Sequence, residues 1–211
     1  MSTEKRGFDQ EAAAWDENPG RVKVAKEIAA AIMDNVTITP DMDALEFGCG
    51  TGLVSLQLQP FVRSITGIDS SNGMLDVFRS KIARLKLTNV TVRFVDLDRG
   101  DALTGSYQLL VSSMTLHHVK DFRPLLDQFR AITAPGGFLC IADLDSDEGK
   151  FHENNSGVFH HGFDREELRA AVEAAGFADV SFITATEISK PSPTGEMRNF
   201  TVFLLTARRI E

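Results

Sequence analysis

The chain has 211 residues, of which 43% are hydrophobic and 25% charged, and this length and composition predict one globular domain over residues 1–211. A formal net charge of -8 disfavours tight binding to nucleic acid or to an anionic membrane, so neither is expected as a partner. The polar N-terminus begins no apolar run typical of a signal peptide or membrane span, and two isolated cysteines fit a reduced protein, which together predict a cytoplasmic location.

The first predicted elements are two helices. Residues 8–15 favour a helix that stops near Pro19 and Gly20. Apolar residues then recur at helical spacing and predict a second helix over residues 21–35. Because these apolar residues form a single face, we expect the second helix to pack on a sheet.

A short strand, a glycine-rich loop and a helix-compatible segment follow. Residues 44–47 form an apolar run that includes Glu46 and is typical of a buried parallel strand. Three glycines stand at alternate positions after it: Gly48, Gly50 and Gly52. Glycine allows a ligand to lie against the main chain, and the N-terminal amides of a following helix point into the same space. The arrangement predicts a ligand site, against the alternative of a turn that uses glycine for packing alone.

The spacing of the glycines indicates which ligand is expected. In the dinucleotide-binding pattern G-x-G-x-x-G, the third glycine would stand where this chain has Leu53. The sequence Glu-x-Gly-x-Gly-x-Gly instead resembles motif I of the class I S-adenosylmethionine-dependent methyltransferases, particularly the small-molecule enzymes of the ubiquinone/menaquinone-biosynthesis type. The resemblance implies that Glu46 faces the positive end of S-adenosylmethionine. It also implies that the loop beneath the amino-acid part of this cofactor consists of Gly48, Cys49, Gly50, Thr51 and Gly52.

The next predicted strand, over residues 64–68, ends in an acidic side chain. Asp69 follows the start of the glycine loop by about 20 residues, and there a carboxylate can accept hydrogen bonds from both ribose hydroxyls. The resemblance implies that Ser70 and Met74 lie around the adenosine. The alternative for Asp69 is an exposed loop residue.

A third strand, over residues 90–95, is rich in β-branched residues and also ends in acidic side chains. The resemblance implies that Asp96 holds the adenine amino group and that Leu97 packs on the ring. Asp98 could substitute for Asp96, and a plain turn is the further alternative.

The remaining pattern completes the predicted fold. Strands are expected over residues 107–111, 138–142, 180–188 and 199–207, and helices over residues 123–133 and from residue 163. A turn over residues 191–195 is expected to join the last two strands as a hairpin. The resemblance implies that Ser113 contacts the cofactor, and the long polar loop over residues 146–162 is a candidate substrate wall. The predicted fold class is α/β, a Rossmann-like doubly wound sheet of seven mostly parallel strands whose last strand is antiparallel.

The N-terminal segment carries a further resemblance. Its pattern Phe-Asp-x-x-Ala-x-x-Trp-Asp is similar to the segment that covers the cofactor pocket in the same family. This implies that residues 1–20 form a lid and that Trp15 lines the site. The alternative is a surface helix anchored by Phe8 and Trp15.

The histidines are the candidates for acceptor chemistry. All five lie in predicted loops: His117, His118, His152, His160 and His161. Each could be structural and bond to loop carbonyls, or a general base could come from His117, His118, His160 or His161. A metal site with Asp143 or Asp145 is a third possibility. Neither adjacent histidine pair has the i, i+4 spacing that presents two ligands on one helix face, so no metal is expected.

The predicted function is methyl transfer from S-adenosylmethionine to a small-molecule acceptor through an oxygen, nitrogen or carbon nucleophile. The alternatives are a nicotinamide-dependent oxidoreductase on a related sheet and a regulator that binds S-adenosylmethionine without turnover. We expect a monomer or a homodimer.

Overall fold

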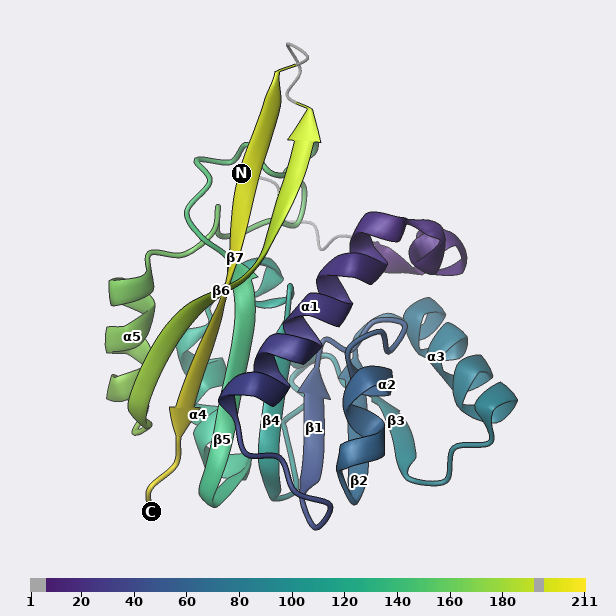
Figure 1. The fold of residues 1–211 in the computed structure, drawn as a ribbon, viewed down its shortest axis with the longest axis vertical. Coiled ribbons are helices and arrows are strands. Elements are labelled where there is room, and N and C mark those ends of the chain that lie inside the picture. Colours follow the sequence, from purple (N-terminus) through teal and green to yellow (C-terminus); the bar gives the residue numbers. More distant parts are fainter. Residues whose placement is uncertain (1–6, 192–195) are drawn as a thin grey trace.

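The computed structural model describes residues 7–191 and 196–211, and its centre is a seven-stranded sheet in the order β3-β2-β1-β4-β5-β7-β6 (Figure 1). The strands are β1 (Asp43–Phe47), β2 (Ser64–Asp69), β3 (Val90–Phe94), β4 (Tyr107–Ser113), β5 (Thr133–Leu144), β6 (Ala178–Pro191) and β7 (Met197–Arg208). β7 runs antiparallel to β5 and β6, whereas the other neighbouring strands pair in parallel. The predicted Rossmann-like α/β sheet with an antiparallel last strand is confirmed.

Helices cover both faces of this sheet (Figure 1). They are α1 (Pro19–Asn35), α2 (Ser55–Leu58), α3 (Asn72–Leu85), α4 (Arg123–Ile132) and α5 (Arg165–Ala174). Apolar residues of α1, α2 and α3 pack in one buried cluster with Ala44, and those of α4 and α5 pack in a second cluster with Leu45. Since Ala44 and Leu45 are neighbours on β1, the alternation of strand side chains places the two clusters on opposite faces.

The predicted helix over residues 8–15 differs from the observed structure. The segment forms two short 3₁₀ helices, η1 (Phe8–Gln10) and η2 (Ala12–Glu17), instead of one α-helix. Side chains of this segment bond to distant parts of the chain, so tertiary contacts, more than helix propensity, set its backbone. Pro19 and Gly20, which were expected to end the first helix, are instead the first two residues of α1. The Asn18 side chain caps α1 by accepting hydrogen bonds from two backbone N–H groups in the first turn of the helix.

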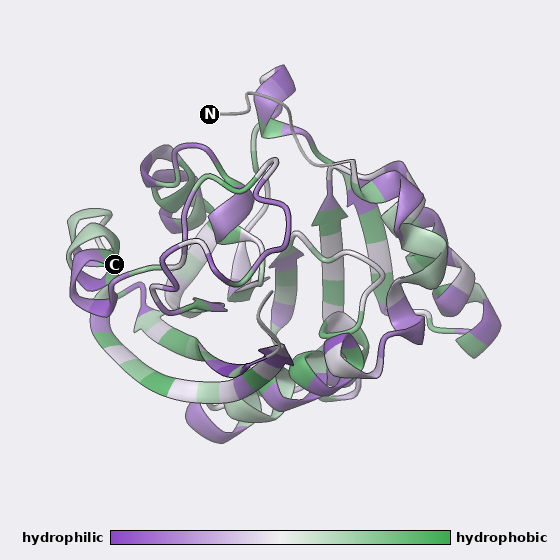
Figure 2. Ribbon diagram, turned by 90° about the horizontal axis from the view of Figure 1, so that it is seen from above, coloured by the Kyte–Doolittle hydropathy of each residue, from purple (hydrophilic) through white to green (hydrophobic). Residues whose placement is uncertain are grey.

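The loops at the carboxyl ends of the parallel strands are more polar than the sheet beneath them. Figure 2 shows strands banded with hydrophobic residues and largely hydrophilic loops above them. The predicted turn over residues 191–195 lies, apart from Pro191, outside the described residues. Within residues 7–191 and 196–211, no helix combines the length and the apolar character required to cross a membrane.

Candidate active site

A cavity of about 1100 Å³ lies at the carboxyl ends of β1, β2 and β4, where the strand order reverses between β1 and β4. All of the predicted cofactor residues except Gly52 line it: Trp15, Glu46, Gly48, Cys49, Gly50, Thr51, Asp69, Ser70, Met74, Asp96, Leu97 and Ser113. The ends of four strands, β1, β2, β3 and β4, therefore contribute to one cleft.

The three glycines of the loop have different tasks, although all have positive φ angles. A Cβ atom on Gly48 would lie 2.3 Å from the side chain of Thr115, and one on Gly52 would lie 2.3 Å from the ring of Phe78. These two glycines allow close packing inside the protein, and of the two only Gly48 also lines the cavity. A Cβ atom on Gly50 would meet nothing within 4 Å. The main chain at Gly50 therefore offers open space to a ligand.

Asp69 links the end of β2 to the glycine loop. Its Oδ2 atom accepts a hydrogen bond from the backbone N–H of Gly50 at 2.8 Å, and its Oδ1 atom accepts one from Ser71 at 2.8 Å. Each carboxylate oxygen can accept more than one hydrogen bond. Asp69 can therefore fix the loop and still receive ligand hydroxyls.

Glu46 is buried at the end of β1, with 2% of its surface exposed. Burial raises the pKa of Glu46 to about 8, although the hydroxyl of Ser55 donates a hydrogen bond to its carboxylate and opposes this shift. A positive charge arriving in the cavity would favour the ionised form.

Asp96 and Asp98 both line the cavity beyond β3. Asp96 is 7% exposed, and its side chain accepts a hydrogen bond from the backbone N–H of Asp98 at the start of the 3₁₀ helix η4 (Leu97–Arg99). Arg99 lies 3.4 Å from its other oxygen. Either aspartate can reach a ligand in this part of the cavity, so both remain candidates for the adenine amino group.

The N-terminal segment covers one side of the cavity and is held in place by two aspartates. Asp9 accepts hydrogen bonds from the Ser71 hydroxyl at 2.6 Å and from the backbone N–H of Gly73 at 2.8 Å. Asp16 accepts a hydrogen bond from the Thr51 hydroxyl at 2.6 Å and pairs with Lys81. These contacts join the segment to the glycine loop and to the start of α3.

Two aromatic residues of this segment face the cavity. Phe8 lies edge-on to Trp15, with ring centroids 5.9 Å apart, and also to His118 at 5.1 Å. The guanidinium of Arg21 lies 3.6 Å above the Trp15 ring. The segment therefore contacts both the cofactor side and the histidine side of the cavity.

His117 is buried, and so is Asp143 beside it. The Nδ1 atom of His117 lies 2.6 Å from the Oδ1 atom of Asp143, which also accepts a hydrogen bond from the backbone N–H of Leu144. The Oδ2 atom of Asp143 accepts one from the backbone N–H of His117. Burial opposes ionisation of this carboxyl, but His117 and these hydrogen bonds outweigh it and lower the pKa of Asp143. An ionised carboxylate can only accept hydrogen bonds, so the Nδ1 atom of His117 carries the proton of this contact. In the neutral form of the ring, the lone pair is then on Nε2, which the contact with Asp143 does not involve.

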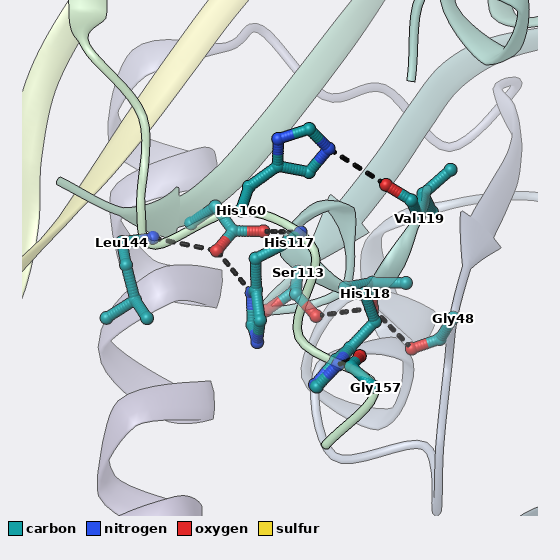
Figure 3. Close-up of polar contacts among 10 residues, drawn as sticks. Gly48, Ser113, His117, His118, Val119, Leu144, Gly157 and His160 are labelled. Carbon is teal, nitrogen blue, oxygen red and sulfur yellow. Dashed lines mark hydrogen bonds and ion pairs between the residues drawn. The ribbon is translucent and has the colours of Figure 1, made fainter. Parts of the chain in front are cut away.

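In His118 the Nδ1 atom is again the hydrogen-bond donor. Its Nδ1 atom lies 2.7 Å from the backbone carbonyl oxygen of Gly157, which also can only accept (Figure 3). The two histidines belong to the 3₁₀ helix η5 (Leu116–His118), and their ring centroids are 4.1 Å apart. His152 lies close to both, at 5.1 Å from His117 and 5.7 Å from His118. All three line the cavity.

The other two candidate bases, His160 and His161, are not among the residues that line the cavity. The Nε2 atom of His160 bonds to the backbone oxygen of Val119 at 3.0 Å (Figure 3), and its ring stacks on Phe163. The structure thus brings two of the four candidate bases to the site and adds His152, which was not among them. In the sequence, the one indication that His152 lies at the site was its place in the polar loop over residues 146–162, because this loop was expected to form a substrate wall.

Comparison with known proteins agrees with this geometry. The family described as "Methyltransferase domain" matches residues 21–181. An uncharacterised methyltransferase of Schizosaccharomyces pombe is 34% identical over 135 residues, which are 57% of this chain and 48% of that protein. An O-methyltransferase of Aspergillus nomiae is 28% identical over 190 residues, which are 83% of each chain. The chain spans about half the length of several of the curated relatives that it matches.

A solved structure with the same fold is phosphoethanolamine N-methyltransferase 2 of Haemonchus contortus in complex with S-adenosylmethionine. It superposes with a TM-score of 0.71 at 16% sequence identity, and the match covers 98% of this chain and 60% of that one. At this identity the likeness concerns the fold.

Proposed function

This chain belongs to the family of methyltransferase domains and uses S-adenosylmethionine, and from that premise we propose that it methylates a small molecule on oxygen. The observation that carries the proposal is the group of three histidines on the wall of the cofactor cavity. A hydroxyl acceptor has to lose its proton on methylation, and imidazole side chains are suited to assist this loss near neutral pH. The Aspergillus nomiae relative, an O-methyltransferase, supports an oxygen acceptor. The narrower likeness to the ubiquinone/menaquinone type stays a prediction.

The cavity fits the cofactor. S-adenosylmethionine supplies an electrophilic methyl group, whose carbon–sulfur electron pair returns to sulfur when the acceptor oxygen forms its bond to carbon. The open main chain at Gly50 leaves room for the amino-acid part, and the positive charge of that part would favour the ionised form of Glu46, whose pKa burial raises to about 8. Asp69 would accept hydrogen bonds from the ribose hydroxyls, and Asp96 or Asp98 would accept one from the adenine amino group.

Two of the proposed bases keep that role. His117 and His118 line the cavity, and the Nδ1 atom of His117 bonds to Asp143, whereas that of His118 bonds to the backbone oxygen of Gly157. Their Nε2 atoms would be the ones that assist an acceptor. His160 and His161 are better explained as structural residues of the loop.

The N-terminal segment would act as the lid. Its described part, from residue 7 onward, places Phe8 and Trp15 on the cavity wall and is held by Asp9 and Asp16. A lid that excludes water would favour attack of the acceptor on the methyl carbon over side reactions with water. We keep residues 1–20 as its proposed extent, of which residues 1–6 lie outside the described part.

The test is turnover against matched acceptors. The protein would be incubated with S-adenosylmethionine and a panel of phenols and aliphatic alcohols, alongside amines of the same carbon skeletons. We expect S-adenosylhomocysteine to form with a hydroxyl acceptor, and not with its amine counterpart. Turnover with amines alone would contradict the oxygen acceptor. Cofactor affinity by calorimetry without turnover on any acceptor would favour a non-catalytic regulator.

A further inference from the structure

We infer that His117, His118 and His152 form a binding site for one divalent transition-metal ion on the wall of the cavity. Each histidine offers one ring nitrogen, and these three atoms all lie within 4.8 Å of one another. The three side chains come from two distant segments, η5 and the polar loop over residues 146–162. Only small side-chain movements would bring the three nitrogen atoms to the separations that one ion requires.

The outer contacts of the cluster are those of metal-binding histidines. A histidine that binds a metal through one nitrogen usually donates its other N–H group to a carboxylate or a backbone carbonyl, which fixes the ring and its tautomer. His117 has Asp143 in this position at 2.6 Å, and His118 has the carbonyl oxygen of Gly157 at 2.7 Å (Figure 3). Both rings therefore keep Nε2 as the ligand atom.

Burial provides a second, independent observation. His117 is 1% exposed, and its Nε2 atom has no hydrogen-bond partner in the described part of the chain. Buried polar atoms are normally satisfied, so a buried lone pair beside two other imidazoles points to a ligand. The Nε2 atom of His152 is buried as well. The ring of Phe151 packs edge-on against Phe200 and holds this part of the loop on the sheet.

The donor set indicates the kind of ion. Three imidazoles suit Zn²⁺ and its neighbours Co²⁺, Ni²⁺ and Fe²⁺, whereas Mg²⁺ and Ca²⁺ prefer oxygen ligands. Structural zinc sites use four protein ligands, while a site with three keeps a position open for water or substrate. Since all three histidines line the cavity, the open position would face it.

The task of the ion rests on the proposed function and replaces the general-base role of His117 and His118, because a ring nitrogen that binds the ion cannot also accept a proton. A hydroxyl oxygen of the acceptor bound at the open position would have a lowered pKa, because the ion stabilises the deprotonated form. The proton leaves to solvent, and the oxygen retains the electron pair that forms the bond to the methyl carbon. The site therefore selects acceptors with a hydroxyl group that can reach the histidines.

The experiment measures metal binding before activity. The full chain would be stripped with a chelator and titrated with Zn²⁺ by calorimetry and with Co²⁺ by visible absorption, which reports the coordination of the ion directly. We expect one ion per chain and a visible spectrum typical of Co²⁺ with about four ligands. His118→Ala and His152→Ala should each abolish that spectrum, and Asp143→Asn should weaken binding by about 10- to 100-fold.

The control is His161→Ala, which removes an exposed histidine of the same loop and should leave the titration unchanged. Thermal melts and S-adenosylhomocysteine binding would show that each variant is folded. Absence of one-to-one binding, or binding that survives both His118→Ala and His152→Ala, would overturn the metal site and leave the proposed function standing. Metal binding without turnover on any hydroxyl acceptor would support the site and contradict the proposed function.

Discussion

Asp143, at the end of β5, and His117, which follows β4, meet at 2.6 Å with both side chains buried. Asp143 also accepts the backbone N–H group of Leu144 at 2.8 Å, so one carboxylate satisfies several buried donors. The pair ties the loop after β4 to the neighbouring strand, and this contact sets the direction in which the His117 ring faces the cavity.

Removal of this carboxylate should destabilise the protein. Asp143→Ala leaves the N–H groups of His117 and Leu144 buried without their acceptor, at a cost of about 1–3 kcal/mol for each group. We expect the free energy of unfolding, measured by urea denaturation, to fall by roughly 2 kcal/mol or more. Asp127→Ala, which removes an exposed aspartate on α4, is the control and should have little effect. Equal stabilities of the two variants would contradict the structural role of Asp143.

Loss of Asp69 should weaken cofactor binding. Asp69→Ala removes the acceptor for the Gly50 N–H group as well as the proposed ribose contacts. We expect S-adenosylhomocysteine to bind about 1–3 kcal/mol less tightly by calorimetry, the scale of charge-assisted hydrogen bonds. Asp76→Ala removes a carboxylate exposed on α3 and serves as the control. Unchanged affinity in the Asp69 variant would refute the ribose assignment.

A side chain at Gly50 should block the ligand directly. Gly50→Val fills space that the protein leaves open, whereas Gly136→Val adds the same side chain at a similar positive φ angle outside the residues that line the cavity. Both variants should lose stability, by roughly 1–2 kcal/mol, because L-residues tolerate this backbone conformation poorly. We expect Gly50→Val alone to lose S-adenosylhomocysteine binding. A normal isotherm for Gly50→Val would show that the ligand does not approach the main chain there.

Glu46 should make stability depend on pH. Its pKa is about 8 in the folded protein against an ordinary value of 4.5, so between these values the folded chain holds a proton that the unfolded chain has released. The free energy of unfolding must therefore fall as pH rises through this window, by up to about 1.4 kcal/mol per pH unit from this residue.

Glu46→Gln removes this titration. The difference in pH dependence between Glu46→Gln and the unchanged protein therefore gives the contribution of Glu46 apart from those of other titrating groups. Urea denaturation at about pH 6 and about pH 8 should show a smaller decline for Glu46→Gln than for the unchanged protein. Glu173→Gln, at an exposed position on α5, should decline as the unchanged protein does. Parallel pH profiles for the unchanged protein and Glu46→Gln would mean that Glu46 is ionised when folded.

Release of the lid should accelerate ligand loss. Asp16→Ala removes the hydrogen bond with Thr51 and the ion pair with Lys81, while Glu17→Ala removes the same charge from the next, exposed position. A lost hydrogen bond of about 0.5–1.5 kcal/mol corresponds to roughly 2- to 13-fold in the dissociation rate of S-adenosylhomocysteine. Stopped-flow measurement should show this change for Asp16→Ala alone. Equal rates in both variants would argue against the lid.

The order of the elements could be predicted from local sequence patterns. Apolar runs, glycine spacing and acidic residues after each strand are short-range features. The ends of parallel strands meet at one sheet edge, so the joint position of Glu46, Asp69 and Asp96 followed from the predicted topology. The tertiary structure agrees, since all three residues line one cavity.

Other features depended on contacts that no local pattern encodes. Gly50 faces the cavity while Gly52 faces Phe78, a division set by the packing of α3 on the loop. The N-terminal segment takes 3₁₀ geometry, with its aspartates bound to distant partners. His152 joins His117 because a long loop folds back over the strand ends, and the path of such a loop is decided by packing across the molecule and not by the residues beside the histidine.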